Sequence, residues 1–317
     1  MNKTVLITGG CGFIGSHLAD ALLAAGYRVR ILDNLSTGKR ENVSGSCEII
    51  VGDITDQQTV QKAMAGISAC FHLAAIVSVP LSVSDWLGTH RVNLTGAIHI
   101  FDAARTSPDQ QPIPVIYASS SAIYGDNPQL PLAESAPPAP LSAYGADKMG
   151  MELHARVATL THGVPTLGFR FFNVYGPRQD PSSPYSGVIS IFIDRIRKGE
   201  PLLIYGDGEQ QRDFVYVGDV VEFLLKGWKK CQEKACHTGN PPEALNVCTG
   251  IGSTINSLAE TLFSVMGQST PIHHGPPRLG DILNSVGSAD RGRQLLNFSS
   301  RVSLSEGLNK TVHFLNS

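Results

Sequence analysis

Tyr144 and Lys148 stand four residues apart in a stretch with helical periodicity. Side chains at this spacing share one face of a helix. A tyrosine, with an ordinary pKa of about 10, is a poor base at neutral pH unless a nearby cation stabilises its phenolate. Such pairs are common by chance, and the chemistry that this pair could perform is acid–base catalysis by the phenol.

A run of three serines, Ser119-Ser120-Ser121, follows a predicted strand at 115–118, shortly before the helix that carries Tyr144. The carboxyl ends of parallel strands converge on the ligand crevice of an α/β sheet. We therefore expect a hydroxyl, a phenol and an ammonium group to meet there. The spacing leaves open which of the three serines supplies the hydroxyl.

A glycine-rich turn, Gly9-Gly10-Cys11-Gly12-Phe13-Ile14-Gly15, lies between the first predicted strand and its helix. Gly9 permits a tight turn, Gly12 lets the backbone approach a pyrophosphate, and Gly15 allows the helix to pack closely on the strand. A plain glycine-rich turn is the alternative. The context of strand, turn and helix favours a dinucleotide site.

Asp33 ends the second predicted strand, about the distance from the glycines at which such folds bind the adenosine ribose. Its charge would repel a 2′-phosphate, which favours NAD over NADP, although Lys39 and Arg40 leave room for NADP. Asp53 after the third strand could contact the adenine or cap the next helix, with Asp56 resembling a capping box.

The order of elements predicts a Rossmann-type doubly wound parallel sheet at 1–172 and a smaller C-terminal α/β substrate-binding domain at 173–317, with segments that can return to the sheet. Small residues, Leu73-Ala74-Ala75, end the fourth strand, where packing alone would also explain them. The ranges that carry this prediction are strands at 3–8, 28–32, 47–51, 69–73, 115–118, 166–171, 214–217 and 244–247, and helices at 14–26, 57–65, 86–105 and 143–161.

The composition is that of an ordinary globular protein: 317 residues, 42% hydrophobic, 16% charged, with a net charge of -2. Nucleic acid is therefore not an expected partner. No apolar run is long enough for a signal peptide or a membrane span, so we expect a cytoplasmic protein without a membrane partner. The six scattered cysteines and ten histidines lack metal-ligand spacing, and no metal is expected.

The glycine motif with Ser16-His17, the Tyr-x-x-x-Lys pair and Ser119-Ser120-Ser121-Ala122-Ile123-Tyr124-Gly125 resemble the extended short-chain dehydrogenase/reductase family over nearly the whole chain. Within that family the chain resembles the UDP-sugar 4-epimerases. The segments that carry this closer resemblance are 171–178 (FFNVYGPR), 206–208 (GDG), 212–217 (RDFVYV) and 278–281 (RLGD).

The resemblance implies that Tyr144 takes the proton of the sugar 4-hydroxyl while NAD accepts the hydride from the same carbon. The 4-keto sugar then turns over and receives the hydride on its other face. Ser120, four residues before Tyr124, matches the catalytic serine or threonine of the family, although the assignment could slip to Ser119 or Ser121.

The resemblance also implies binding residues for NAD and for a UDP-sugar. The expected NAD contacts are Gly9, Gly12, Phe13, Ile14, Gly15, Asp33, Asn34, Thr37, Gly38, Asp53, Ile54, Leu73, Ala74, Ala75, Asn93, Tyr144, Lys148 and Phe171. The expected substrate contacts are Ser121, Asn173, Val188, Tyr205, Arg212, Arg278, Asp281 and Gly287. The two arginines could bind the diphosphate with forked donors, and surface salt bridging is the alternative.

Gly287 occupies a place where, by resemblance, a bulky residue restricts the pocket beside the hexose C2 substituent. An N-acetyl group is then expected to fit, so UDP-N-acetylglucosamine and UDP-N-acetylgalactosamine are expected substrates beside UDP-glucose and UDP-galactose. Gln179-Asp180-Pro181 resembles the branch that uses N-acetylhexosamines. A simple turn glycine is the alternative for Gly287.

Four other interpretations use the same fold. A nucleotide-sugar dehydratase is disfavoured, because Ser121-Ala122 stands where such enzymes carry Asp-Glu. A decarboxylase, a simple reductase and a non-catalytic regulator that binds NAD or a UDP-sugar remain. The family also implies a homodimer, in which Met149, Met151, Leu153 and Val157 of the Tyr-Lys helix would face a partner or the core.

Overall fold

The computed structural model describes residues 3–105, 111–180, 187–233, 244–277 and 282–316. The chain forms two compact units. The first comprises the described parts of 1–123, 142–170 and 221–245, and the second those of 124–141, 171–220 and 246–317. Because the chain passes from one unit to the other several times, neither is a single continuous segment. The domain boundary at residue 172 stays a prediction.

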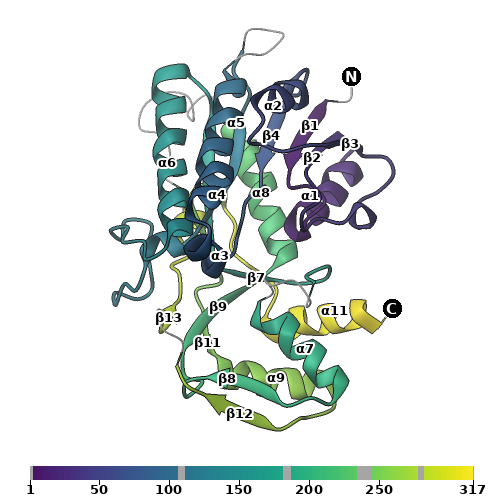
Figure 1. Ribbon diagram of the computed structural model, residues 1–317, viewed down its shortest axis with the longest axis vertical. Coiled ribbons are helices and arrows are strands. Elements are labelled where there is room, and N and C mark those ends of the chain that lie inside the picture. Colours follow the sequence, from purple (N-terminus) through teal and green to yellow (C-terminus); the bar gives the residue numbers. More distant parts are fainter. Residues whose placement is uncertain (1–2, 106–110, 181–186, 234–243, 278–281, 317) are drawn as a thin grey trace. The chain divides into compact units, whose positions relative to one another are not determined.

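The predicted doubly wound parallel sheet is confirmed. Seven strands lie in the order β10-β6-β5-β4-β1-β2-β3. Figure 1 labels four of them, β1 to β4. Strand β1 pairs in parallel with both β2 and β4, so the strand order reverses beside it, where such sheets bind ligands at their carboxyl ends. The bounds are β1 Thr4–Thr8, β2 Arg28–Asp33, β3 Glu48–Val51, β4 Ala69–His72, β5 Val115–Ser120, β6 Thr166–Phe171 and β10 Leu245–Val247.

Helices cover both faces of this sheet because its strands are apolar on both sides. In β4, Cys70 packs into a core shared with α2, α5 and α6, whereas its neighbour Phe71 packs edge-on against Trp228 of α8. Successive strand residues point to opposite faces, which explains this division. The helices are α1 Phe13–Ala24, α2 Gln57–Met64, α3 Val79–Ser84, α4 Trp86–His90, α5 Gly96–Ala104, α6 Ala143–His162 and α8 Val217–Cys231.

The helix predicted at 86–105 is interrupted. Between α4 and α5 the five residues Arg91–Thr95 form a π-helix, and the separate α3 precedes α4. Within the π-helix, the Asn93 side chain accepts a hydrogen bond from Ile76 N at 2.8 Å and donates one to Ile76 O at 2.9 Å. The widened turn thus coincides with an asparagine that binds the segment following β4, a local feature that helical periodicity does not reveal.

The second unit contains smaller sheets and its own apolar core. Strand β9 pairs in parallel with β7 and β13 and antiparallel with β11, while β8 and β12 form a two-stranded parallel sheet. The strands are β7 Asn173–Tyr175, β8 Leu202–Tyr205, β9 Gln211–Tyr216, β11 Gly252–Thr254, β12 Ile272–Gly275 and β13 Asn284–Ser285. The helices are α7 Val188–Lys198, α9 Ile255–Met266, α10 Asp290–Leu296 and α11 Leu304–Asn316.

Across the described ranges, none of the helices combines the length and apolar character needed to cross a membrane. Those same ranges contain no cluster of three or more His, Cys, Asp or Glu side chains that could hold a metal ion.

Candidate active site

Two glycines of the glycine-rich turn, Gly9 and Gly15, have no room for a side chain. Gly9 has a φ of 69°, and a Cβ atom there would lie 2.8 Å from Ala74 N. A Cβ on Gly15 would overlap the carbonyl oxygen of Gly9. Helix α1 starts directly after Gly12 without a side-chain cap, so its first amide groups are available to an anion. This backbone cradle fits the pyrophosphate of a dinucleotide.

Asp33 joins the glycine-rich turn to the loop after β2. Its Oδ2 accepts from Cys11 N and its Oδ1 from Leu35 N, both at 2.9 Å, and the residue is only 7% exposed. A Cβ on Gly38 would lie 3.0 Å from Oδ2, so this glycine permits the loop to pass beside the carboxylate. A carboxylate has about four acceptor positions. Asp33 therefore retains capacity for ribose hydroxyls.

Asp53 is not the cap of α2. That role belongs to Asp56, whose side chain accepts from Gln58 N, so the alternative that placed the cap at Asp53 was wrong. Asp53 accepts instead from Asn34 Nδ2 at 3.0 Å and Thr55 N at 2.8 Å. Although burial acts to raise it, these hydrogen bonds hold the pKa of Asp53 below its ordinary value. The proposed NAD contacts Asn34 and Asp53 thus lie side by side.

The end of β4 runs against the glycine-rich turn. Leu73 N donates to Thr8 O at 3.1 Å, and Ala74 N donates to Thr8 Oγ1 at 3.2 Å. Small residues at 74 and 75 are thus compatible with a backbone that passes close to Gly9. Asn93 is 1% exposed, and the bonds of its side chain run to Ile76, which indicates that it orders this segment.

Tyr144, Lys148 and Ser120 come together at the end of β5. The Ser120 hydroxyl hydrogen-bonds the Tyr144 side chain, and Lys148 Nζ lies 5.8 Å from the centre of the Tyr144 ring. Lys148 is 3% exposed, and its Nζ donates to Ala118 O at 2.7 Å. The sequence spacing thus brings the predicted phenol, ammonium and hydroxyl to one place.

Burial governs the ionisation of these groups. It raises the pKa of Tyr144, which the hydrogen bond from Ser120 opposes. It lowers the pKa of Lys148 to about 8, against the opposing charges of Asp147 and then Glu152. The lysine thus stays cationic at neutral pH. His72, which hydrogen-bonds Thr8, has a pKa lowered to about 3 by burial and by Lys148, and is neutral.

The three serines differ in what they contact. Ser119 Oγ donates to Glu152 Oε1 at 2.5 Å, whereas Ser120 Oγ accepts from Ala122 N at 3.1 Å and also reaches Tyr144. Ser121 opens the short 3-10 helix Ser121–Tyr124. This geometry favours Ser120 as the catalytic hydroxyl. Sequence reasoning missed Glu152, although its position four residues after Lys148 places it on the same helical face.

The second unit contains an open pocket of about 460 Å³ beside Tyr205, a size that suits a nucleoside. Its lining residues are Tyr205, Gly206, Asp207, Gln210, Gly275, Pro277 and Leu283. Arg212 donates through Nη1 to Gln211 O at 2.9 Å and to Leu283 O at 3.2 Å, so it is joined to this lining. The predicted contacts Arg278 and Asp281 lie outside the described residues.

Gly287 is required by packing. A Cβ atom there would lie 2.7 Å from Cys248 Sγ and 2.7 Å from Phe172 Cζ. Gly287 also bridges to Leu132, and its amide donates to Asp213 Oδ2 at 3.3 Å. The missing side chain therefore does not open space by itself, which corrects the reason for which we expected an N-acetyl group to fit. Of the other predicted contacts, Asn173 starts β7, Val188 starts α7 and Phe171 ends β6.

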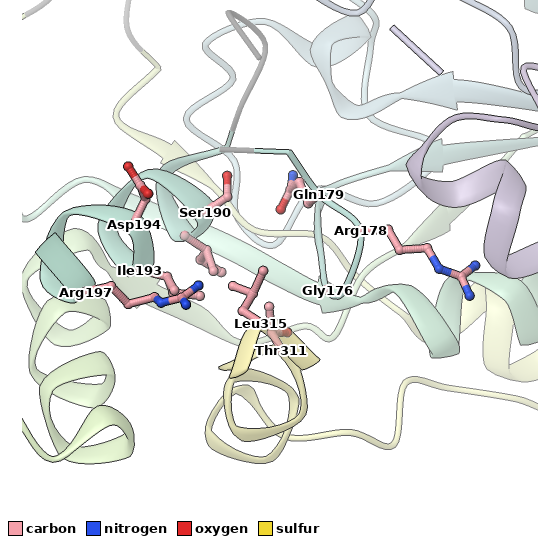
Figure 2. A pocket seen from close by; sticks show the side chains of 10 residues that line it. Gly176, Arg178, Gln179, Ser190, Ile193, Asp194, Arg197, Thr311 and Leu315 are labelled. Atoms are coloured by element: carbon pink, nitrogen blue, oxygen red, sulfur yellow. The ribbon is translucent and has the colours of Figure 1, made fainter. Parts of the chain in front are cut away.

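A second cavity in this unit lies among the loop 176–179, α7 and α11 (Figure 2). Gln179, Ser190, Ile193, Thr311 and Leu315 are among the residues that line it. Its volume of about 30 Å³ has room for water and is far too small for a sugar or a nucleotide.

The model of the NAD dependent epimerase/dehydratase family matches residues 5–248. The structure of UDP-glucose 4-epimerase from Thermotoga maritima, with UDP-glucose, is 35% identical with a TM-score of 0.90, covering 99% of this chain and 98% of that one. The UDP-N-acetylglucosamine 4-epimerase of Methanobrevibacter ruminantium, in complex with UDP-N-acetylmuramic acid, is 36% identical with a TM-score of 0.90 and the same coverage. A UDP-N-acetyl-alpha-D-glucosaminuronate decarboxylase of Bacillus cytotoxicus is 32% identical over 332 residues, which cover 99% of this chain and 98% of that protein.

Proposed function

The chain belongs to the NAD dependent epimerase/dehydratase family, and from this premise we propose that it inverts the 4-hydroxyl of UDP-hexoses through a transient 4-keto sugar. The observation that carries the proposal is the joint placement of Ser120, Tyr144 and Lys148 at the end of β5. These groups belong to the same unit as the glycine-rich turn and Asp33. Such an arrangement suits proton transfer at a sugar oxygen.

NAD is the cofactor, and the residues that fit it are the backbone of Gly9, Gly12 and Gly15 for the pyrophosphate and Asp33 for the adenosine ribose. When bound, this cofactor would supply an acceptor for the hydride from the sugar C4 and, in its reduced form, the donor that returns the hydride. Asn34 and Asp53 are the proposed contacts on the adenine side.

In this proposal Tyr144 removes the proton of the 4-hydroxyl and later returns it to the same oxygen, after the ketone has turned over and its other face has received the hydride. Lys148 supplies the positive charge that favours the phenolate, since its ammonium is buried beside the ring. Ser120 donates its single hydroxyl proton to the Tyr144 phenolate. Once the phenol has formed, Ser120 accepts from it and donates to the sugar oxygen, so that both partners of the proton transfer are held by one hydroxyl.

For the substrate we propose that the pocket beside Tyr205 accepts the uridine and that Arg212 contacts the diphosphate, with Arg278 and Asp281 as further contacts. UDP-N-acetylglucosamine and UDP-N-acetylgalactosamine are the proposed sugars, together with UDP-glucose and UDP-galactose. The support for the acetylated pair is the 36% identity with a UDP-N-acetylglucosamine 4-epimerase and the segment 179–181.

A decarboxylase of UDP-hexuronates is the second candidate, because one relative with that name is 32% identical over almost the whole chain. Such a reaction would use the same oxidation at C4 and would release carbon dioxide from the keto acid. The products distinguish the two reactions directly.

The proposed assembly is a homodimer in which α6 contacts a partner copy. Leu153, Val157 and Leu160 of this helix are each at least half exposed, whereas Met151 is fully buried in the core. The spacing of three and four residues places the exposed residues in one apolar stripe.

We also propose a cytoplasmic location, which the free thiols of Cys11, Cys47, Cys70, Cys231 and Cys248 support.

The test is to incubate the purified protein, without added NAD, separately with acetylated UDP-hexoses, non-acetylated UDP-hexoses and UDP-hexuronates, and to separate the products. The proposal predicts a mixture of 4-epimers from a hexose and no turnover by Tyr144→Phe. A UDP-pentose would indicate the decarboxylase, a deoxy-keto sugar the dehydratase, and binding without turnover a regulator.

A further inference from the structure

Glu152 is the third member of a side-chain series on α6. Tyr144, Lys148 and Glu152 follow one another at four-residue spacing, so they share a face of the helix. Each contacts a different one of the last three residues of β5. Tyr144 bonds Ser120, Lys148 bonds the carbonyl of Ala118, and Glu152 bonds the hydroxyl of Ser119. Three successive residues at the end of β5 are therefore each hydrogen-bonded to a side chain of α6.

The carboxylate of Glu152 also binds the neighbouring strand. Arg170 of β6 donates to it twice, from Nε to Oε1 at 3.0 Å and from Nη2 to Oε2 at 2.7 Å. The two side chains are only 6% and 14% exposed. A single carboxylate thus joins α6 to β5 and to β6, immediately behind the residues that carry the chemistry.

A buried ion pair is weak evidence for a stabilising role, because removing two charges from water offsets most of their attraction. The pair of Glu152 and Arg170 instead fixes the geometry of the site, because two parallel hydrogen bonds to a guanidinium define the orientation of the carboxylate. That orientation in turn selects Ser119 as the hydroxyl bound by Glu152 and leaves Ser120 to bind Tyr144.

We propose that Glu152 is a positioning residue of the active site, which holds Ser119 through the ion pair with Arg170 so that Ser120 and the carbonyl of Ala118 stay aligned with Tyr144 and Lys148. This inference rests on the proposed function for its effect on turnover, but the alignment itself is a property of the first unit. Among the described residues, the charged and titratable groups around Lys148 are Tyr144, Asp147 and Glu152 of α6 and His72 of β4.

Ser119→Ala is the variant that tests the proposal, because it removes one hydroxyl and leaves the pair of Glu152 and Arg170 intact. Glu152→Gln would leave Arg170 buried without its carboxylate and can unfold the chain. We expect Ser119→Ala to lower kcat by between about tenfold and a hundredfold, as displaced catalytic groups do. The KM for the UDP-sugar should stay unchanged, and Ser119→Thr should restore kcat.

The matched control is Thr166→Val. Thr166 is 4% exposed, and its hydroxyl contacts Thr159 of α6 at 2.8 Å, far along the helix from Tyr144. This variant removes a buried hydroxyl between the same helix and β6, so it reports the effect of lost stability alone. Its kcat should equal that of the unchanged protein. An equal loss of kcat in both variants would overturn the proposal.

A second readout does not depend on turnover. The phenolate absorbance of the NAD-loaded protein, minus that of its Tyr144→Phe counterpart, gives the pKa of Tyr144. Losing the bond from Ser120 should weaken the acidity of Tyr144 by about tenfold in Ser119→Ala. If the unchanged protein converts no UDP-hexose, the proposed function fails and this titration still decides the alignment. An unaltered titration in Ser119→Ala would refute the role of Glu152.

Discussion

Lys148 Nζ donates a hydrogen bond of 2.7 Å to the carbonyl oxygen of Ala118, which fixes a buried ammonium at the end of β5. Burial lowers the pKa of this lysine to about 8, so its charge is present at neutral pH and is lost as the pH rises. The positive charge of Lys148 beside the Tyr144 ring therefore depends on pH.

The first prediction concerns pH. Because the protonated fraction of Lys148 falls as the pH rises through about 8, kcat should decline on the alkaline side of that value. Asp147 raises the pKa of Lys148, so Asp147→Asn should move the falling limb of the pH-rate profile to lower pH. Asp102→Asn, at an exposed position on α5, is the control and should leave the limb in place. If the falling limb of the pH-rate profile lies at the same pH in the unchanged protein, Asp147→Asn and Asp102→Asn, this account is contradicted.

The second prediction separates the serines. Ser120→Ala should lower kcat by about a hundredfold, since it removes the hydroxyl that hydrogen-bonds Tyr144 and that we propose to bind the reacting oxygen. Ser121→Ala, at a proposed substrate contact, should instead raise the KM by about tenfold with kcat retained. Steady-state kinetics of both variants provide the measurement. The assignment is wrong if the two results are exchanged.

The third prediction concerns the cofactor. Asp33→Ala should reduce the affinity for NAD by between about tenfold and a hundredfold, because it removes the ribose acceptor and releases Cys11 N and Leu35 N. Discrimination against NADP should fall as well. Calorimetric titration with both nucleotides measures this effect. Asp56→Ala, the lost cap of α2, should cost about 1 kcal/mol of stability without changing either affinity.

The fourth prediction concerns the glycine-rich turn. Gly15→Ala should destabilise the protein by about 3 kcal/mol or more and reduce its NAD content, because the new methyl would overlap the backbone of Gly9 and Gly10. Gly45→Ala, where a Cβ meets nothing within 4 Å, is the matched control. Denaturant unfolding and the NAD content of the purified proteins check both. If Gly15→Ala and Gly45→Ala have the same free energy of unfolding, the packing role of Gly15 is contradicted.

The fifth prediction concerns assembly. Sedimentation velocity should show a dimer for the unchanged protein and a monomer for the double variant Leu153→Glu, Val157→Glu, since charges would interrupt the apolar stripe of α6. Ile251→Glu, at another exposed apolar position, should remain dimeric. A monomer at all concentrations of the unchanged protein would exclude the proposed contact.

Much of the fold could be predicted because its signals are local. The alternation of short apolar runs with helical periodicity predicted the parallel sheet, and Gly9, Gly12 and Gly15 predicted the backbone cradle. The interruption at Arg91–Thr95 could not be predicted, because it coincides with Asn93 binding a segment 17 residues earlier. The cap of α2 was ambiguous for a different reason, since either Asp53 or Asp56 satisfies the same pattern.

The sequence by itself determined which chemical groups are available: a tyrosine and a lysine at helical spacing, a serine run, and glycines after the first strand. Only the tertiary structure decided which serine faces Tyr144 and why Gly287 has no side chain. Those outcomes depend on Glu152, Arg170, Cys248 and Phe172, which are distant in sequence from the positions they affect. Local spacing specifies which face of a helix a side chain lies on. The residues that the side chain contacts are determined by packing and hydrogen bonding between strands that are distant in sequence.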